Sequence, residues 1–367
     1  MLQIDHVHFY VEDAQWWRDW FVKYLGFQSV VSSIFPTLVD RGKSFHTCTE
    51  VVKNGNVYFL LSSPLLPTSP VAEFLRHHPP GVADVAFLVT DVETVTARAS
   101  ANGAKVLQPV QDEISIKFAK IAAWGGLTHT LMERQEVKAK DGEKNLSPIP
   151  NSQLHKTFSG IDHVVLNVKV GDLQAAVSWY ENILDFQPQQ SFKIQTNRSA
   201  LSSQVMISAN GGVQLPINEP ASPNSQIQEF LDVNRGAGIQ HIALRTPNIV
   251  SAIARFRAAG LSFLSVPQTY YSQLQERLEV PLSPSELQAI AQQEILVDCQ
   301  KDAPLGALLL QIFTQPIFCE PTFFFEFIER RSQAQGFGEG NFRALFEAIE
   351  SEQIKRGFVS HRISKNT

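Results

Sequence analysis

Cysteine is scarce in this sequence: Cys48, Cys299 and Cys319 are the only three in 367 residues. Their odd number and unpaired spacing give no basis for a disulfide framework or for a thiolate site that binds zinc. Long hydrophobic runs are also missing, because no stretch approaches the roughly 18 apolar residues that a membrane-spanning helix needs. Acidic residues interrupt the N-terminal segment, at Asp5 and at positions 12–13, so this segment lacks the apolar core of a secretory signal peptide.

Charge of either sign is modest. Charged residues make up 18% of the sequence and the net charge is -5, which argues against nucleic acid or an anionic membrane as the main partner. Hydrophobic residues make up 44%, as in an ordinary globular enzyme. We therefore expect a soluble, cytoplasmic protein. The sequence does not specify an oligomeric state, and a homo-oligomer, either a dimer or a tetramer, is expected only because most soluble oligomers are of this kind. The length exceeds what one hydrophobic core usually fills, which predicts two domains.

The chain repeats itself at a fixed offset of 157 residues. Residues 4–28 and 161–187 both begin with "IDHV" and both end with "FQ" after an amphipathic stretch. Residues 81–107, which begin "GVADVAFLV", align with residues 238–264, which begin "GIQHIALRT", at the same offset. Two separate matches at one offset indicate a duplicated domain, and a duplication of this kind decides the expected fold.

Each half of the chain contains two similar units. A unit opens with an alternating strand such as "HVVLNV" at 163–168 and continues with an amphipathic helix such as residues 172–184. Further alternating strands close the unit, for example "LSSQVMISAN" at 201–210. These periodicities predict an α+β fold in which a βαβββ-type unit occurs four times.

A polar segment with two prolines, residues 135–159, separates the two halves of the chain. Its composition predicts an interdomain linker. We accordingly place an N-terminal domain at residues 1–150 and a C-terminal domain at residues 151–367.

Two helix signals lie outside the repeated pattern. Ser283, Pro284 and Glu286 form the spacing of a helix capping box, which predicts an inserted helix in the fourth unit. A final amphipathic helix is expected to begin near Asn341. The amide oxygen of Asn341 is a candidate to accept a backbone N–H of the first turn.

Three side chains of the second half are candidate metal ligands. His163 and His241 each stand third after a glycine in the first strand of a unit, and Glu326 lies in the apolar stretch "PTFFFEFIER". A single histidine on such a strand is usually a hydrogen-bonded core residue, and a glutamate could lie on an exposed edge strand. A buried, unpaired carboxylate is costly, however, so Glu326 needs a partner. Together the three make a set of two histidines and one carboxylate, which leaves one face of an octahedral iron open.

The first half provides an internal comparison for these ligands. The positions 157 residues earlier hold His6 and Asp84, and Glu133 is a possible match for Glu326. We interpret this set as a vestige rather than a second metal site. Small apolar residues flank Asp84, and the first half lacks the phenylalanine-rich strand that surrounds Glu326.

Several motifs of the second half closely resemble those of the 4-hydroxyphenylpyruvate dioxygenases, a family within the vicinal-oxygen-chelate superfamily. The most specific are "QIFTQPIFCEPTFFFEFIERR" (311–331) and "GFGEGNFRALFEAIE" (336–350), with support from "LPINEP", "SQIQEFL" and "GAGIQHIAL". The first half resembles the family's non-catalytic domain more loosely. The resemblance implies glyoxalase-like domains that form two open barrels, a C-terminal lid helix that excludes water, and Fe2+ bound by His163, His241 and Glu326.

The resemblance also implies a substrate pocket. Four residues would orient the phenol and carboxylate of the substrate, namely Ser203, Asn218, Gln226 and Gln311. Seven more would line the pocket, namely Pro216, Gln240, Phe313, Phe324, Phe337, Asn341 and Phe342. Strand alternation places Phe324 on the face of Glu326, but it points Gln240 away from His241. Without the resemblance, the phenylalanines could be ordinary core and Asn218 a turn residue.

The implied reaction joins 4-hydroxyphenylpyruvate and O2 to give homogentisate and CO2. No separate 2-oxoglutarate is required, because the substrate carries its own 2-oxo acid. Two alternatives stay open. A 4-hydroxymandelate synthase would use the same fold, substrate and metal, although Ser203, Pro216, Asn218 and Phe337 favour the dioxygenase. A non-enzymatic small-molecule binder would keep the pocket without the metal, and the intact ligand set argues against it.

Overall fold

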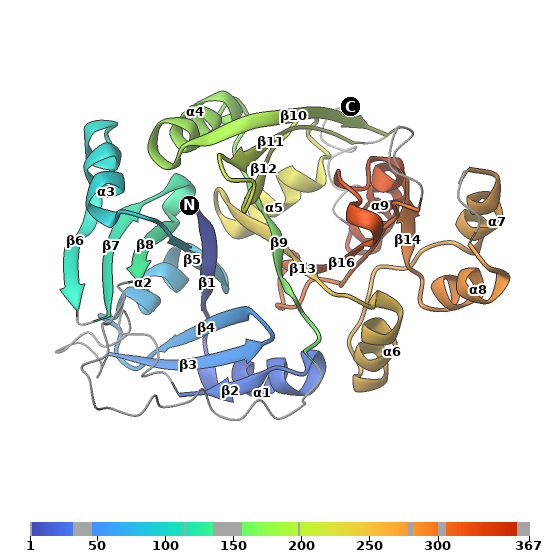
Figure 1. The fold of residues 1–367 in the computed structure, drawn as a ribbon, viewed down its shortest axis with the longest axis horizontal. Coiled ribbons are helices and arrows are strands. Elements are labelled where there is room, and N and C mark those ends of the chain that lie inside the picture. The colour runs from blue at the N-terminus through green and yellow to red at the C-terminus, as the bar shows by residue number, and fades with distance from the viewer. Residues whose placement is uncertain are drawn as a thin grey trace, which may run out of the picture.

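The second half of the chain repeats the sheet of the first half. The computed structural model describes residues 2–31, 46–113, 115–134, 156–196, 199–277, 282–299 and 306–357. Within these ranges two curled, eight-stranded sheets lie side by side (Figure 1). The strand orders are β2-β3-β4-β1-β5-β8-β7-β6 and β10-β11-β12-β9-β13-β16-β15-β14, which are the same topology. None of the helices in these ranges is long and apolar enough to cross a membrane.

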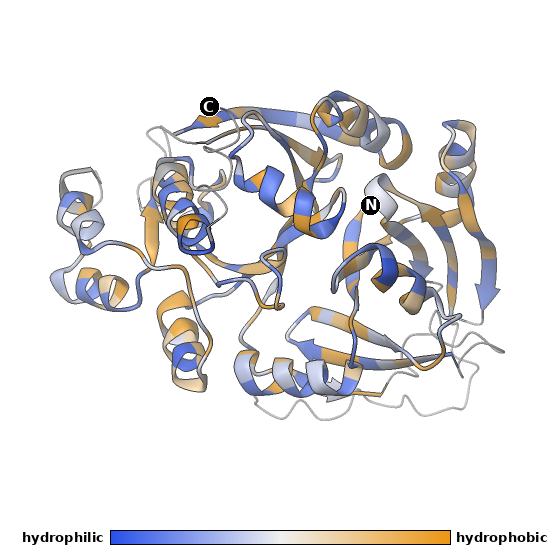
Figure 2. Ribbon diagram, turned by 180° about the vertical axis from the view of Figure 1, so that it is seen from behind, coloured by the Kyte–Doolittle hydropathy of each residue, from blue (hydrophilic) through white to orange (hydrophobic). Residues whose placement is uncertain are grey.

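The first sheet and its helices occupy the described residues up to 134. The strands are β1 (Gln3–Tyr10), β2 (Gln28–Val30), β3 (Thr47–Asn54), β4 (Val57–Pro64), β5 (Gly81–Leu88), β6 (Val106–Glu113), β7 (Ile116–Ala122) and β8 (Thr128–Arg134). The helices are α1 (Ala14–Leu25), α2 (Pro70–His77), α3 (Val92–Ala101) and the 3-10 turn η3 (Trp124–Gly126). The edge strand β6 alternates partly buried and exposed residues over its first six positions, and Figure 2 shows that it carries both hydrophobic and hydrophilic residues.

The second sheet and its helices follow from residue 156. The strands are β9 (Gly160–Asn167), β10 (Phe186–Gln195), β11 (Ala200–Ser208), β12 (Gln214–Pro220), β13 (Gly238–Arg245), β14 (Leu296–Asp298), β15 (Leu309–Phe313) and β16 (Phe324–Arg330). The helices are α4 (Leu173–Leu184), α5 (Gln226–Asn234), α6 (Ile249–Ala259), α7 (Gln268–Arg277), α8 (Pro284–Gln292), η4 (Arg331–Gln333), η5 (Glu339–Asn341) and α9 (Phe342–Lys355).

Each unit has the predicted βαβββ order, and its helix carries the chain from the first strand to the second. The first and last strands of a unit pair in parallel, as β9 does with β12 and β13 with β16. The first strands of two sibling units then pair antiparallel at the centre of each sheet, β1 with β5 and β9 with β13. The prediction of four such units in a duplicated α+β fold is confirmed.

The inserted segment of the fourth unit holds two helices, α7 and α8, which project from one edge of the molecule (Figure 1). The predicted cap of α8 is present, because the Ser283 hydroxyl accepts the backbone N–H of Glu286 at 3.3 Å. The sequence pattern did not predict α7. Residues 278–281 between the two helices lie outside the described ranges.

Aromatic side chains of both halves share one core. Phe325 on β16 is fully buried, and its ring centroid lies 5.7 Å from that of Phe59 on β4. Phe9 on β1 lies 5.2 Å from Phe323, again across the two halves. Phe323, just before β16, and Phe325 within it therefore join the two sheets, while Glu326 points to the opposite face of the strand.

The end of the expected linker belongs to this core. Residues 135–155 lie outside the described ranges, so a domain boundary at residue 150 stays a prediction. Phe158, however, is buried, and its ring stacks 5.8 Å from that of Phe327. A Cβ on Gly55 would lie 1.8 Å from the carbonyl oxygen of Phe158, so only glycine fits there. Thr157 and Phe158 are thus packed into the core, which corrects the prediction of a polar tether at these two positions.

Removing the Phe325 ring tests the shared core. Phe325→Ala should lower the free energy of unfolding by about 3–5 kcal/mol, because it leaves a large cavity between the sheets. Hydrogen exchange should quicken in β4 as well as in β16. Phe118→Ala is the matched control, since Phe118 belongs to a separate cluster inside the first sheet. Faster exchange confined to the second sheet in Phe325→Ala would contradict a shared core.

Candidate metal centre

Three neighbouring strands bring His163, His241 and Glu326 together. In the pairing of β9 with β13, His163 lies opposite Ala243, and in the pairing of β13 with β16, Ala243 lies beside Glu326. His241 precedes Ala243 by two positions and therefore projects from the same face. Ala243 is fully buried and carries only a methyl group. A side chain this small leaves room for the three candidate ligands to converge.

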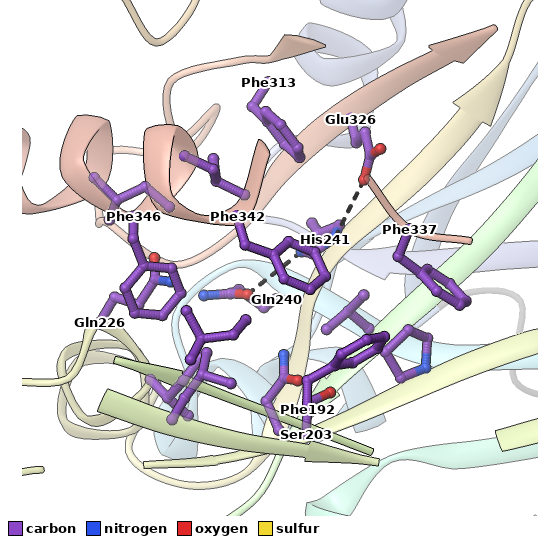
Figure 3. A pocket seen from close by; sticks show the side chains of 18 of the residues that line it. Phe192, Ser203, Gln226, Gln240, His241, Phe313, Glu326, Phe337, Phe342 and Phe346 are labelled. Carbon is purple, nitrogen blue, oxygen red and sulfur yellow. Dashed lines mark hydrogen bonds and ion pairs between the residues drawn. The ribbon is translucent and has the colours of Figure 1, made fainter. Parts of the chain in front are cut away.

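The geometry of the three side chains fits a metal ion. Glu326 Oε2 lies 3.1 Å from His163 Nε2 and 3.6 Å from His241 Nε2, and one donor atom of each residue lies within 4.8 Å of the others. Glu326 is 3% exposed, and its Oε1 has no hydrogen-bond partner among the described residues. A buried carboxylate oxygen without a partner is costly unless a cation satisfies it. Figure 3 shows Glu326 and His241 at this point of the cavity.

The charges around the ligands attract a cation. Burial disfavours a charged imidazole at His163, but the carboxylates of Glu326 and Asp162 outweigh it and raise the pKa of His163 to about 9. For His241 burial prevails and lowers the pKa. Burial would raise the pKa of Glu326, yet the two histidines hold it below its usual value. The carboxylates of Asp162 and Glu326 thus remain ionised beside the imidazoles. A divalent cation that displaces the proton of His163 would be stabilised there.

Each histidine is oriented by the residue before it. Asp162 Oδ1 lies 3.0 Å from His163 Nδ1, and Gln240 Oε1 lies 3.4 Å from His241 Nδ1. A partner at Nδ1 fixes the ring so that Nε2 faces the metal position. The expectation that Gln240 points away is wrong, because a β-bulge at Gln240 shifts the register between Ile239 and His241. The extra residue lets two consecutive side chains face the same cavity.

Glu326 is not on an exposed edge. Its strand, β16, lies between β13 and β15 within the sheet. Phe324 shares its face, as strand alternation predicts, and stacks on the His241 ring with centroids 4.7 Å apart. The alternative that Glu326 lies on an exposed edge strand is therefore excluded by the position of β16 in the sheet.

A largely apolar cavity extends from the three ligands. Most of the residues expected in the pocket line it: Ser203, Pro216, Asn218, Gln226, Gln240, Gln311, Phe313, Phe324, Phe337 and Phe342. Further lining residues, which the sequence motifs did not single out, are Val165, Phe192, Ile194, Leu201, Val205, Ile227, Leu345, Phe346 and Ile349. The polar side chains are few and separated by aromatic walls, as in sites that orient a small organic ligand.

Asn341 does not line the cavity. It is fully buried, and its Oδ1 accepts the hydroxyl of Tyr270 at 2.7 Å. It occupies the N-cap position of α9, as predicted, but its side chain does not make the predicted capping bond. The competing partner is the insertion helix α7, which carries Tyr270. Asn341 therefore anchors the start of the final helix to the insertion.

Two amide oxygens of residues that line the cavity have no hydrogen-bond partner in the described part of the protein. Gln226 Oε1 and Gln311 Oε1 are buried and accept no hydrogen bond within the described ranges. A third amide is fixed, because Asn218 Nδ2 donates to Asn167 Oδ1 at 3.3 Å. The unmet acceptors can take a hydrogen bond from a ligand that carries a hydroxyl group.

The final helix closes the cavity. Phe342, Phe346 and Ile349 of α9 face the ligand space, and Phe342 lies 5.2 Å from Phe192 of β10. Arg356 pairs with Glu229 of α5 at 2.9 Å and holds the end of the helix. The helix thus lies over the cavity mouth in the position of a lid.

Glycines let the preceding loop approach the sheet. Gly338 has φ +76, and a Cβ there would lie 1.8 Å from Gln311 Oε1. A Cβ on Gly340 would lie 2.2 Å from Asp298 Oδ1. The loop therefore packs directly on two side chains of the sheet, one of which lines the cavity.

The first half has a different set of side chains at the corresponding place. In its strand register Thr130 stands beside Ala86, as Glu326 stands beside Ala243, and Thr130 donates to Asp84 at 2.5 Å. Glu133 is therefore not the counterpart of Glu326, which corrects the expected match. Its carboxylate instead accepts the N–H of Val92 at the start of α3.

The same register explains why a metal is not required in the first half. Burial would raise the pKa of Asp84, but the charge of Lys120 helps to hold it lowered. Lys120 pairs with Thr130 as Phe313 pairs with Glu326, so a lysine takes the place of a cavity wall. Among the described residues, His163, His241 and Glu326 are the one group suited to a metal ion. The vestige interpretation of the first half agrees with this geometry.

Comparison with known proteins identifies the relatives of this chain. Residues 160–280 and residues 5–119 each match a model of the Glyoxalase/Bleomycin resistance protein/Dioxygenase superfamily. The chain is 38% identical to the 4-hydroxyphenylpyruvate dioxygenases of Caenorhabditis briggsae and Coccidioides posadasii, covering 97% and 96% of this chain and 93% of each relative. A mutant 4-hydroxymandelate synthase from Streptomyces coelicolor has a similar structure, with a TM-score of 0.78, 27% identity, and coverage of 96% of this chain and 98% of that one.

The ligand assignment predicts which substitutions abolish metal binding. His163→Ala, His241→Ala and Glu326→Ala should each fold but lose most of the bound metal, because two ligands hold a divalent ion far more weakly than three. Metal content per chain, measured by atomic spectroscopy, checks this. His6→Gln is the matched control and should keep one metal per chain. Normal metal content in any ligand variant, or two metals per chain in the unaltered protein, would show the assignment to be wrong.

Proposed function

Since the chain belongs to the 4-hydroxyphenylpyruvate dioxygenase family, we propose that it is an Fe(II)-dependent enzyme that converts 4-hydroxyphenylpyruvate and O2 to homogentisate and CO2. The observation that carries the proposal is the convergence of His163, His241 and Glu326 at one end of a largely apolar cavity. The reaction balances, because the substrate loses its carboxylate as CO2 and both oxygen atoms of O2 are retained in homogentisate.

Fe(II) suits the donor set. His163 and His241 would supply two neutral imidazoles and Glu326 one carboxylate, a combination that non-haem iron oxygenases use because it leaves three positions free. When bound, the iron would supply the redox chemistry for oxidative decarboxylation of a chelated 2-oxo acid. Asp162 and Gln240 hold the imidazoles in the orientation that this requires.

The two ends of the cavity differ in a way that orients the substrate. Glu326 and Phe337 lie toward one end in Figure 3, and Gln226 and Phe346 lie toward the other. The 2-oxo acid would lie at the metal end. The phenol would then point toward Gln226, whose unpartnered Oε1 can accept the phenolic O–H. Such a polar contact in an apolar cavity discriminates against ligands that lack the hydroxyl.

The aromatic walls position the ring of the substrate. Phe337 lies 5.3 Å from the His163 ring, and Phe342 lies above the cavity on the lid helix. Each stacking contact with a phenol ring contributes about 0.5–1.5 kcal/mol beyond area burial. A ring held between these walls is presented to the metal in one orientation, which decides the carbon that is hydroxylated.

The lid excludes water during the reaction. Phe346 and Ile349 of α9 cover the cavity, and Glu350 of the same helix accepts the Ser199 hydroxyl at 2.7 Å. Expelling water prevents oxidising equivalents from being lost to side reactions. The lid therefore contributes to coupling between oxygen use and product formation.

Product analysis tests the proposed reaction. Purified protein with Fe(II) and 4-hydroxyphenylpyruvate should form homogentisate and consume one O2 per product, measured by chromatography and an oxygen electrode. 4-Hydroxymandelate as the main product would instead assign a synthase on the same scaffold. Binding of the substrate without turnover in iron-loaded protein would identify a non-enzymatic binder.

The loop glycine that contacts Gln311 provides a further prediction. Gly338→Ala should push the Gln311 amide aside and strain the loop, which costs about 1–3 kcal/mol for the backbone conformation. We expect kcat/KM to fall by roughly 10-fold or more, with metal content unchanged, since one hydrogen-bonding group is displaced.

Gly103→Ala is the control for Gly338→Ala, because it separates backbone strain from displacement of the Gln311 amide. Gly103 has φ +83, and a Cβ there would meet nothing within 4 Å. This variant should show the strain of a left-handed alanine without any loss of substrate affinity. Equal kinetic effects in the two variants would show that displacement of Gln311 is not the cause.

A further inference from the structure

Arg330 connects the metal centre to the loop that carries Phe337. From its contacts we infer that Arg330 is a positioning residue, which couples the orientation of His163 to the closed position of residues 334–337. The inference rests on the metal site of the proposed function, but it does not depend on the identity of the substrate. The guanidinium has two ends with separate partners, and each end is described in turn.

One end of Arg330 holds Asp162. Arg330 Nη2 donates to Asp162 Oδ1 at 2.7 Å, and Arg330 Nε donates to Asp162 Oδ2 at 2.9 Å. The Asp162 side chain is fully buried and lies 3.0 Å from His163 Nδ1. A bidentate pair of this kind fixes the plane of the carboxylate. Arg330 therefore sets the orientation of the group that orients the ligand His163.

The other end of Arg330 holds the loop. Arg330 Nη1 donates to the carbonyl oxygens of Ala334 at 3.1 Å and Gly336 at 2.9 Å. Phe337 follows directly, and its ring packs 5.3 Å from that of His163. The Arg330 side chain is 9% exposed, so little water competes for these bonds. The Arg330 guanidinium thus bridges the carboxylate that orients His163 and the backbone of the loop.

The position of the loop matters because Phe337 separates two cavities. It lines the metal cavity, and it also lines a polar cavity whose other walls include Arg245, Arg330 and Gln214. A shift of the loop would open the metal centre toward this polar cavity. Arg330 therefore acts on both the ligand and the partition that shields it from water.

Two other arginines show which contacts are specific to Arg330. Arg134 of the first half occupies the corresponding end of β8 and pairs with Asp5 at 2.7 Å, where no metal group is present among the described residues. Arg245 also pairs with Asp162, at 2.6 Å, but contacts none of the loop carbonyls. All three arginines thus pair with an aspartate carboxylate. Among the described residues, only Arg330 also donates to the loop carbonyls.

Coupling of this kind is reciprocal. Suppose that a metal bound to His163 favours the orientation of Asp162 that Arg330 holds. Metal binding then also stabilises the closed loop, and the closed loop strengthens metal binding by the same factor. This reciprocity gives a readout that does not require turnover.

Hydrogen exchange of residues 334–340 measures the coupling. The probe is Fe(II) alone, without substrate and under argon, added to the full-length protein. In the unaltered protein the metal should slow exchange of this segment by about 10-fold, a typical size for a coupling between two sites. Arg330→Gln should exchange faster without metal and should show no slowing when Fe(II) binds. Arg245→Gln is the matched control and should keep the slowing.

A conservative variant separates the two ends. Arg330→Lys can pair with Asp162, but an ammonium cannot hold a carboxylate bidentately and reach two carbonyls at once. We expect it to keep Fe(II) affinity within a few-fold, whereas Arg330→Gln weakens it by about 10-fold, as loss of outer-shell support does. Both variants should uncouple O2 consumption from product.

The possible outcomes distinguish the coupling from the metal site itself. If Fe(II) binds and slows exchange equally in Arg330→Gln and Arg245→Gln, the coupling is wrong while the metal site stands. If Arg330→Lys matches the unaltered protein in both exchange and O2 coupling, the two-ended role is wrong. If the unaltered protein binds no Fe(II), the proposed function fails and the coupling fails with it.

Discussion

The antiparallel pairing of β9 with β13 at the centre of the second sheet is the constraint on which the metal centre depends. It places His163 opposite Ala243, and the parallel pairing of β13 with β16 places Glu326 on the other side of the same alanine. Three ligands from segments far apart in sequence thereby meet across three adjacent strands. Because the strands are hydrogen-bonded in a fixed register, the ligand geometry is largely preorganised before a metal binds.

β16 serves both the core and the site because its two faces are used separately. Phe325 packs against the first half, whereas Glu326 faces the metal position. The duplicated first sheet keeps the same backbone plan but places Thr130 and Lys120 where the second sheet has a ligand and a cavity wall. One topology therefore supports a metal site in one half and a self-satisfied polar cluster in the other, since the side chains at equivalent strand positions differ.

The sequence by itself determined the duplication, the four βαβββ units and the candidate ligands. The offset of 157 residues aligned the two halves of the chain, and the third place after a glycine in the first strands of sibling units paired His163 with His241. Glu326 followed because a carboxylate within an apolar run must have a partner. The family motifs added the pocket residues, most of which do line one cavity. These inferences succeeded because strand periodicity and chain order are local properties.

The tertiary structure alone decided the details that depend on register and on long-range contacts. A β-bulge turned Gln240 toward the cavity, against simple alternation. Asn341 bonded to Tyr270 of the insertion rather than capping its own helix, and strand pairing matched Thr130, not Glu133, with Glu326. Arg330 was ordinary in the sequence, yet it joins Asp162 to the loop. No local pattern encodes such choices, because each is settled by a partner distant along the chain.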